Sequence, residues 1–425
     1  METARNFANI GRQTDVPGQN LQHFMANSPW SAQAVMRQIQ AEMAATPGWA
    51  GGVLMLDESA DEKASAHTAG AGKQRNGRLG KIETSQVSVL LGYAVAGLWA
   101  GVDGELYLPK HWFTPAAASA RKRVGVAEGR EFATKIQLGW QMIKRVCEGP
   151  LPFEAVVCDA LYGQSEWLRA QLDWAGVRYL ADVPADTQVY LTPPQAAARQ
   201  VKRGAKRQTA ATAGPVWHGE AQRVSAVAQR DDTRWERIRV RQTERGVLEE
   251  PFAVRQVWTV REGTLAEEIL VMRREEGGRE TYALGNYPIQ TPIEQLATLK
   301  CQRYFVERLI QDAKSEAGWD ELEAQKYRAW EHHLALTLLA TWFVAQTKWE
   351  WAQQYARDPA LWEQFEVEVL PALSMANVRT LLRAVLPLPQ LSPDQATALV
   401  VEHLVQRTRA RRSRLKSRGN PDGPT

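Results

Sequence analysis

The chain has 425 residues, of which 44% are hydrophobic and 24% charged, and its formal net charge is +4. This length allows two or three domains, or one core domain that carries a large insertion, and the composition is ordinary for a globular protein. No apolar run reaches the ~18 residues needed to cross a bilayer, and the first residues lack the apolar core of a signal peptide, so we expect a cytoplasmic protein without a membrane partner.

The three cysteines, Cys147, Cys158 and Cys301, show no CxxC spacing, and the seven histidines form no metal-ligand pattern. We therefore expect buried, reduced thiols and neither a disulfide framework nor a zinc site.

The first part of the chain is predicted to change from helices to a sheet near residue 51. The predicted elements are a helix over 32–45 and strands over 51–57, 86–96 and 98–108. The run over 51–57 is apolar and ends in Asp57, which is typical of a buried central strand. The polar segment 58–81 between the strands contains an Asn76-Gly77 turn, which favours hairpins.

Helices and strands alternate in the next part of the chain. The predicted elements are a helix over 128–147, a strand over 152–159, a helix over 162–175 and a strand over 178–183. The strand over 152–159 is again apolar and again ends in an acid, Asp159. Hairpin strands followed by this alternation predict an α/β protein with a mixed sheet.

A change of pattern after residue 184 predicts a small β-rich insertion. Its expected strands lie at 235–242, 252–260, 268–273 and 281–284. The chain is thus divided into a helical N-terminal region (1–50), two parts of a core (51–184 and 291–350) separated by the insertion (185–290), a C-terminal helical region (351–406) and a basic tail (407–425).

Residues 300–314 contain no Gly or Pro and are predicted to belong to one helix, which Thr291 can cap and Pro292 can open. At 100° per residue an apolar arc is formed by Leu299, Val306, Leu309, Ile310 and Ala313. On the flank of this arc Glu307 lies between Arg303 and Lys314, with Lys300 beside them.

Two strand-end aspartates and a helix glutamate are together suited to magnesium chemistry. Carboxylate oxygens are preferred Mg²⁺ ligands, and two such ions can activate a water or 3′-hydroxyl and stabilise the leaving oxygen of a phosphodiester. Taken alone, a strand-end aspartate is more often a turn or cap residue, and the flank of the helix could be a salt-bridge stripe. The order Asp57, Asp159, then R-x3-E-x6-K, with a β insertion between, is much more specific.

At this point the chain resembles the bacterial insertion-sequence transposases of the DDE type, in the group with a Y-x2-R-x3-E-x6-K signature. The resemblance runs from about Asn20 to about Thr347. It is carried by VLMLDES around Asp57, GRLGKIETSQVSV, ELYLPKHW, VVCDALYG around Asp159, and RYFVERLIQDAKSEAGWDELE. Lys300 stands at the position of the signature tyrosine, and the region before Asn20 is shorter than the N-terminal DNA-binding segment usual in the family.

The resemblance implies a ribonuclease-H-like mixed-sheet core that is interrupted by a β-strand domain and flanked by mainly helical terminal regions. It also implies Mg²⁺-dependent cleavage of double-stranded DNA at transposon ends, with Mn²⁺ able to substitute, and strand transfer into target DNA. A homodimer in a synaptic complex and association with the nucleoid when DNA is bound would follow. Asp57, Asp159 and Glu307 would be the metal ligands, and Arg303 and Lys314 the basic residues that contact DNA, with Lys300 still able to meet a phosphate.

Three basic clusters outside this helix are further candidates for DNA contacts, because cations clustered in sequence bind phosphates. They are represented by Lys73, Arg75 and Arg78, by Lys202 and Arg203, and by Arg411 and Arg412 in the tail. The first cluster could equally be a solvated hairpin, and the second an exposed loop.

Two other functions are compatible with this pattern. The same core could be a metal-dependent nuclease that hydrolyses DNA without strand transfer, or a catalytically inactive DNA-binding protein descended from a transposase. The complete set of three carboxylates favours an enzyme over a pure binder.

Overall fold

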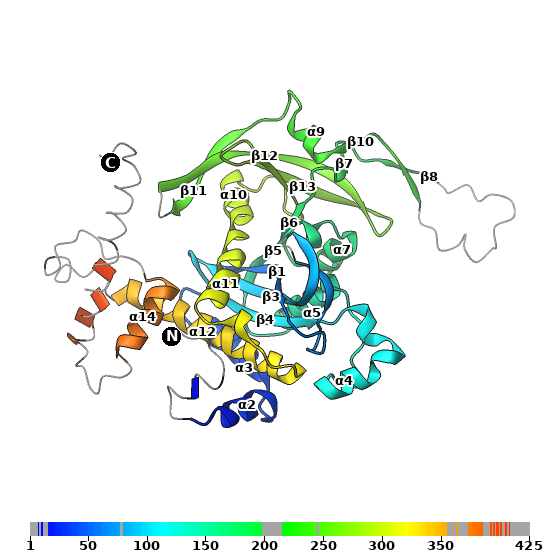
Figure 1. The fold of residues 1–425 in the computed structure, drawn as a ribbon. Helices are drawn as coiled ribbons and strands as arrows, with labels where there is room; N and C mark the ends of the chain where they lie inside the picture. Colours follow the sequence, from blue (N-terminus) through cyan, green and yellow to red (C-terminus); the bar gives the residue numbers. More distant parts are fainter. Residues whose placement is uncertain are drawn as a thin grey trace, which may run out of the picture.

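The computed structural model describes residues 16–76, 80–197, 215–243, 246–354 and 373–385, together with a few single residues near both ends. Figure 1 shows a layered α/β molecule in which helices lie at both ends of the described chain around a large mixed sheet. No helix of the described residues is long and apolar enough to cross a membrane.

Helices α2 (Gly18–Ala26) and α3 (Ala32–Ala45) precede the core. The strands of the core are β1 (Gly52–Glu62), β2 (Gly72–Asn76), β3 (Lys81–Val95), β4 (Leu98–Tyr107), β5 (Phe153–Cys158) and β6 (Tyr179–Val183). The helices between them are α4 (Ala118–Val124), α5 (Lys135–Cys147), α6 (Ala160–Gly163) and α7 (Glu166–Trp174). The polar segment predicted over 58–81 therefore contributes the end of β1 and all of β2.

The insertion and the C-terminal part follow. The insertion contains β7 (Gln188–Tyr190), β8 (Gln195–Ala197), β9 (Val216–His218), β10 (Ala221–Arg223), α9 (Val224–Ala228), β11 (Glu236–Thr243), β12 (Gly246–Arg261), β13 (Thr264–Arg274) and β14 (Glu280–Gly285). After it come α10 (Ile293–Gln302), α11 (Tyr304–Ser315), α12 (Tyr327–Gln354) and α14 (Met375–Val385). The four insertion strands predicted from the sequence are confirmed.

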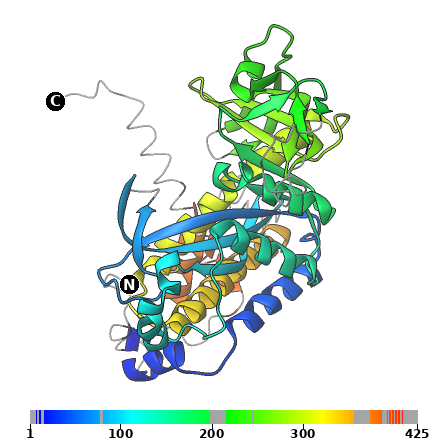
Figure 2. The ribbon, with the colours of Figure 1, turned by 90° about the vertical axis from the view of Figure 1, so that its right-hand side faces the viewer.

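The core strands have the spatial order β4-β3-β1-β5-β6. β1 is antiparallel to β3 and parallel to β5, which is in turn parallel to β6. The insertion continues this sheet, because β14 pairs antiparallel with β6 and carries β13 and β12 beyond it. Figures 1 and 2 show these green strands as a lobe at one end of the core.

Alternating side chains of β1 pack into two different clusters, as expected for a strand buried on both faces. Leu54 and Leu56 pack with residues of α5, such as Met142. Val53 and Met55 pack on the other face with residues of α10 and α11, including Val306. The predicted apolar arc over 299–313 is therefore confirmed as the face that covers the sheet.

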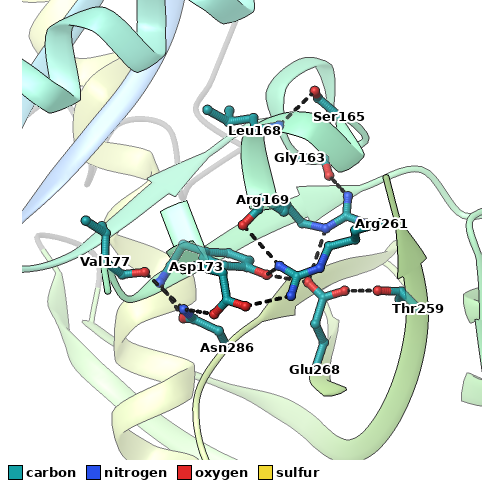
Figure 3. Close-up of polar contacts among 11 residues, drawn as sticks. Gly163, Ser165, Leu168, Arg169, Asp173, Val177, Thr259, Arg261, Glu268 and Asn286 are labelled. Atoms are coloured by element: carbon teal, nitrogen blue, oxygen red, sulfur yellow. Dashed lines mark hydrogen bonds and ion pairs between the residues drawn. The ribbon is translucent and has the colours of Figure 1, made fainter. Parts of the chain in front are cut away.

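A buried polar network joins the insertion to the core (Figure 3). The Glu268 carboxylate of β13 accepts hydrogen bonds from Arg169 Nε at 3.1 Å and from the Tyr179 hydroxyl at 2.6 Å, and also from Thr259. Arg261 of β12 donates to the Tyr179 hydroxyl at 2.7 Å and to Asp173 at 2.8 Å. Two strands of the insertion are thus connected with α7 and β6 through groups that, apart from Asp173, are buried.

Several local predictions were wrong. The helix expected over 128–147 begins only at Lys135. The predicted helix over 291–314 is interrupted at Arg303, and α10 begins at Ile293 after Pro292, which makes no side-chain cap. Strand β1 does not end at Asp57 but continues to Glu62, because its second half still pairs with β3 after β5 has ended. Cys158 and Cys301 are buried free thiols as predicted, but Cys147, which is also free, is exposed at the last residue of α5.

Candidate functional site

Three aspartates stand in one row across adjacent parallel strands. Leu56 of β1 pairs with Cys158 of β5, and Cys158 pairs with Ala181 of β6. These three residues are followed in the chain by Asp57, Asp159 and Asp182, respectively. Because paired parallel strands lie about 4.8 Å apart, this register places the three aspartates next to one another.

Asp57 is the most perturbed member of the row. Its side chain is 14% exposed, and one carboxylate oxygen accepts a hydrogen bond of 2.7 Å from the backbone N–H of Glu58. Burial and the nearby Asp159 carboxylate raise the pKa of Asp57 from 3.8 to about 7. The two carboxylates predicted to act together are therefore close enough to repel each other.

Asp159 caps the short helix α6, where its Oδ1 accepts hydrogen bonds from the N–H groups of Leu161 at 3.0 Å and Tyr162 at 3.3 Å. Burial raises the pKa of the Asp159 carboxyl, and Glu58 adds to the shift. Helix α6 ends in Gly163, whose missing side chain allows the helix to lie directly against the Asp182 carbonyl of β6. This close approach gives a physical reason for the glycine in the motif VVCDALYG.

Glu307 lies on α11 and is connected to the row through Arg303. Leu309 of this helix packs over Gly92 of β3, where an added Cβ would lie 2.8 Å from the Leu309 side chain. Glu307 itself is 53% exposed, and its carboxylate lies 2.8 Å from Arg303 Nη2. The same guanidinium approaches Asp57 through Nη1 at 3.9 Å, so that Arg303 lies between the two acids.

The other predicted basic residues of this region have acidic partners within the chain. The Lys300 side chain is 2% exposed, and its ammonium donates to Asp182 Oδ1 at 2.7 Å. Lys314 donates to the Asp61 carboxylate and to the Ala60 carbonyl at 3.2 Å. Their contacts with DNA remain predictions, and for Lys300 burial is an obstacle to any phosphate contact.

The remaining DNA-binding candidates are only partly described. Lys73 is exposed on β2 and pairs with Thr84, six residues along β3 from the partner of Asp57, which corresponds to about 20 Å. It is therefore not beside the aspartate row. The Arg75 side chain, Arg78, Lys202, Arg203, Arg411 and Arg412 lie outside the described residues.

Carboxylate oxygens on rigid strands fit a hard divalent cation, and the mutual repulsion of Asp57 and Asp159 would be relieved by one. The described residues nevertheless contain no group of three or more acidic, histidine or cysteine side chains already placed to hold a metal. Glu307 is instead turned onto Arg303. The carboxylate oxygens of Asp57, Asp159 and Glu307 are chemically suited to Mg²⁺ or Mn²⁺. To bind such an ion, Glu307 would have to leave the Arg303 guanidinium.

Three acidic residues of this region were missed in the sequence. Asp182 completes the row, Asp61 pairs with Lys314, and Glu58 pairs with Lys135 at 2.7 Å. A signal for Asp182 was present, because it lies near the end of a third apolar strand. Nothing in the sequence marks Asp61 or Glu58 as neighbours of these lysines.

The crowding of acids predicts a pH-dependent effect on stability without metal. Between pH 4 and pH 7 folded Asp57 keeps a proton that the unfolded chain has lost, so its ionisation reduces the free energy of unfolding as the pH rises. Asp57→Asn should therefore raise Tm over the wild type at pH 8 in the presence of a chelator, and much less at pH 4. An equal difference in Tm at both pH values would contradict this.

Comparison with known proteins identifies the family of the chain. The family model of the DDE superfamily endonucleases matches residues 2–247, which include Asp57 and Asp159. The chain is also 25% identical over 183 residues to a protein of Microchaete diplosiphon named as a probable transposase for insertion sequence element IS701. That alignment covers 42% of this chain and 43% of the relative, so the chain spans less than half of the relative's length. With more than half of its residues matched by the family model, the chain belongs to the DDE superfamily of endonucleases.

Proposed function

We propose that this protein is a DNA transposase that cleaves at transposon ends and joins them to target DNA. The observation that carries the proposal is the register that sets Asp57 beside Asp159, with Glu307 linked to Asp57 through one guanidinium. The family match and the probable transposase among the relatives support it. The strand order β4-β3-β1-β5-β6, with only β1, β5 and β6 parallel, also supports a ribonuclease-H-like core.

In this proposal Asp57, Asp159 and Glu307 hold Mg²⁺, which Mn²⁺ can replace. When bound there, divalent cations would activate a water or 3′-hydroxyl and stabilise the leaving oxygen of the phosphodiester. Asp57 and Asp159 hold their carboxylates at fixed positions on the sheet, and the backbone N–H groups of α6 orient Asp159. Arg303 then binds a DNA phosphate through Nη1 and Nη2, which no longer contact Asp57 and Glu307. Terminal-repeat and target DNA would be the partners, bound by a homodimer.

A labelled transposon-end duplex incubated with Mg²⁺ and a target plasmid tests this function. A transposase yields nicked ends and products in which the 3′-hydroxyl end is joined to the target. Hydrolysis without joining would favour the nuclease, and DNA binding without either product would favour an inactive binder.

The basic tail is predicted from the sequence to supply nonspecific affinity for DNA. Seven cations lie in the twelve residues from Arg407 to Arg418, and each phosphate contact contributes roughly 0.9 to the slope of log affinity against log salt. Deleting residues 407–425 should weaken DNA binding and flatten that slope, measured by fluorescence anisotropy. Replacing the seven cations by glutamine at constant length should have the same effect. An unchanged slope would remove the tail from the DNA interface.

A further inference from the structure

Asp182 differs from the other two aspartates of the row because both of its oxygens are already occupied by cations. Oδ1 accepts a hydrogen bond of 2.7 Å from Lys300 Nζ, and Oδ2 lies 3.2 Å from Arg303 Nε. A carboxylate held in this way is a poor candidate for a metal ligand. It is instead well placed to orient Arg303 toward Asp57 and Glu307.

The buried lysine fixes the aspartate. Lys300 is 2% exposed, and a buried ammonium without a partner is strongly unfavourable, so Asp182 has to remain with it. The single negative charge of Asp182 then faces the positive charges of Lys300 and Arg303. The excess positive charge is carried by Arg303, which is the more exposed of the two cations at 29%.

Arg303 has a planar guanidinium whose nitrogens have fixed relative directions. With Nε held by Asp182, Nη1 is directed at Asp57 and Nη2 at Glu307. Arg303 is also the residue that separates α10 from α11.

We propose that Asp182 is a positioning residue for Arg303: its carboxylate, fixed by Lys300, holds Arg303 Nε so that both terminal nitrogens point into the site of Asp57 and Glu307. This inference rests on the proposed function. If the two acids held a divalent cation, Nε would keep its partner, and Nη1 and Nη2 would become free donors. They are then aimed at a DNA phosphate, which a guanidinium can bind through two parallel hydrogen bonds.

The first test needs no activity. The Arg303 side-chain Nε–H signal in the ¹⁵N NMR spectrum of the full chain, assigned by its loss in Arg303→Lys, should exchange slowly with water in the wild type. Removing Asp182 and its buried partner together, in Asp182→Asn/Lys300→Met, avoids an unpaired lysine and should shift the signal and speed its exchange. Lys300→Met alone should shift the signal less than the double variant, because the Asp182 carboxylate remains beside Nε but loses the ammonium that fixes it. Asp186→Asn, at an exposed aspartate after β6, should leave the signal in place. A signal unchanged in the double variant would overturn the proposal.

The second test asks whether Asp182 acts through Arg303. Asp182→Asn/Lys300→Met should slow cleavage of the end duplex on the order of 10²-fold, the cost of a misplaced group. Arg303→Ala should slow the wild type similarly, yet change the double variant less than about threefold, because coupled residues are not additive. If Arg303→Ala slowed cleavage by the same factor in the wild type and in the double variant, Asp182 would only neutralise Lys300, and the proposal would be overturned. If the wild type itself does not cleave, the proposed function fails, whereas the NMR result still decides the placement of Arg303.

Discussion

Asp57→Asn is expected to abolish both cleavage and strand transfer while leaving the fold and DNA binding intact. Metal ions provide several kcal/mol of transition-state stabilisation, and each 1.36 kcal/mol is a factor of ten, so the loss should be about 10³-fold or more. Asp159→Asn and Glu307→Gln should behave in the same way. Binding of end DNA should survive in all three, or become tighter, because each change removes negative charge that repels phosphate.

Glu166→Gln is a suitable control for this series. Glu166 lies in the first turn of α7, as Glu307 lies in the first turn of α11, and both are exposed, but Glu166 is outside the aspartate row. This control should cleave and join DNA like the wild type. If Glu307 served only as the ion-pair partner of Arg303, Glu307→Gln would keep partial activity and show a lower Tm instead. Wild-type turnover in any one of the three variants would refute the role of that residue.

Glu268→Ala should cause the largest loss of stability of any variant considered. The Glu268 side chain is fully buried at 0% exposed, and Arg169 beside it is 4% exposed. Removing the carboxylate leaves the Arg169 guanidinium without its counterion and takes a hydrogen-bond acceptor from Tyr179. Breaking one partner of such a buried pair costs about 3–5 kcal/mol. Calorimetry and urea unfolding should both report the loss.

An exposed ion pair of the same sheet provides the comparison. Glu249 lies 3.2 Å from Arg237, with side chains 45% and 68% exposed. Exposed pairs contribute about 0–1 kcal/mol, so Glu249→Ala should hardly change Tm. The difference in free energy of unfolding between Glu268→Ala and Glu249→Ala measures how much burial adds to the contribution of an ion pair. If both were equally stable, the network in Figure 3 would not hold the insertion to the core.

The alternation and composition of the sequence were sufficient to predict most strands and helices of the described chain. Apolar runs such as 51–57 and 152–159 became β1 and β5, and the arc over 299–313 became the buried face of α10 and α11. These predictions succeed because helix and strand periodicity is set by the nearest residues in the chain. The candidates Asp57, Asp159 and Glu307 were named in the same way, from local patterns and a family signature.

The length of β1, the continuation of the sheet through β14 and β6, and the break at Arg303 were not predictable from local patterns. The first two depend on a partner strand far away in the chain. The second half of β1 exists because β3 is there to accept its hydrogen bonds, and the insertion joins the core because β14 meets β6 about a hundred residues later.

The sequence by itself determined which residue types the candidate site contains: two aspartates after apolar runs and a glutamate on an amphipathic helix with basic neighbours. Only the tertiary structure decided how they are combined. Strand register added Asp182 to the row, and packing buried Lys300 against it and turned Arg303 toward Asp57 and Glu307. The physical reason is that the charge state and orientation of a side chain depend on burial and on neighbours in space, which the order of residues along the chain does not specify.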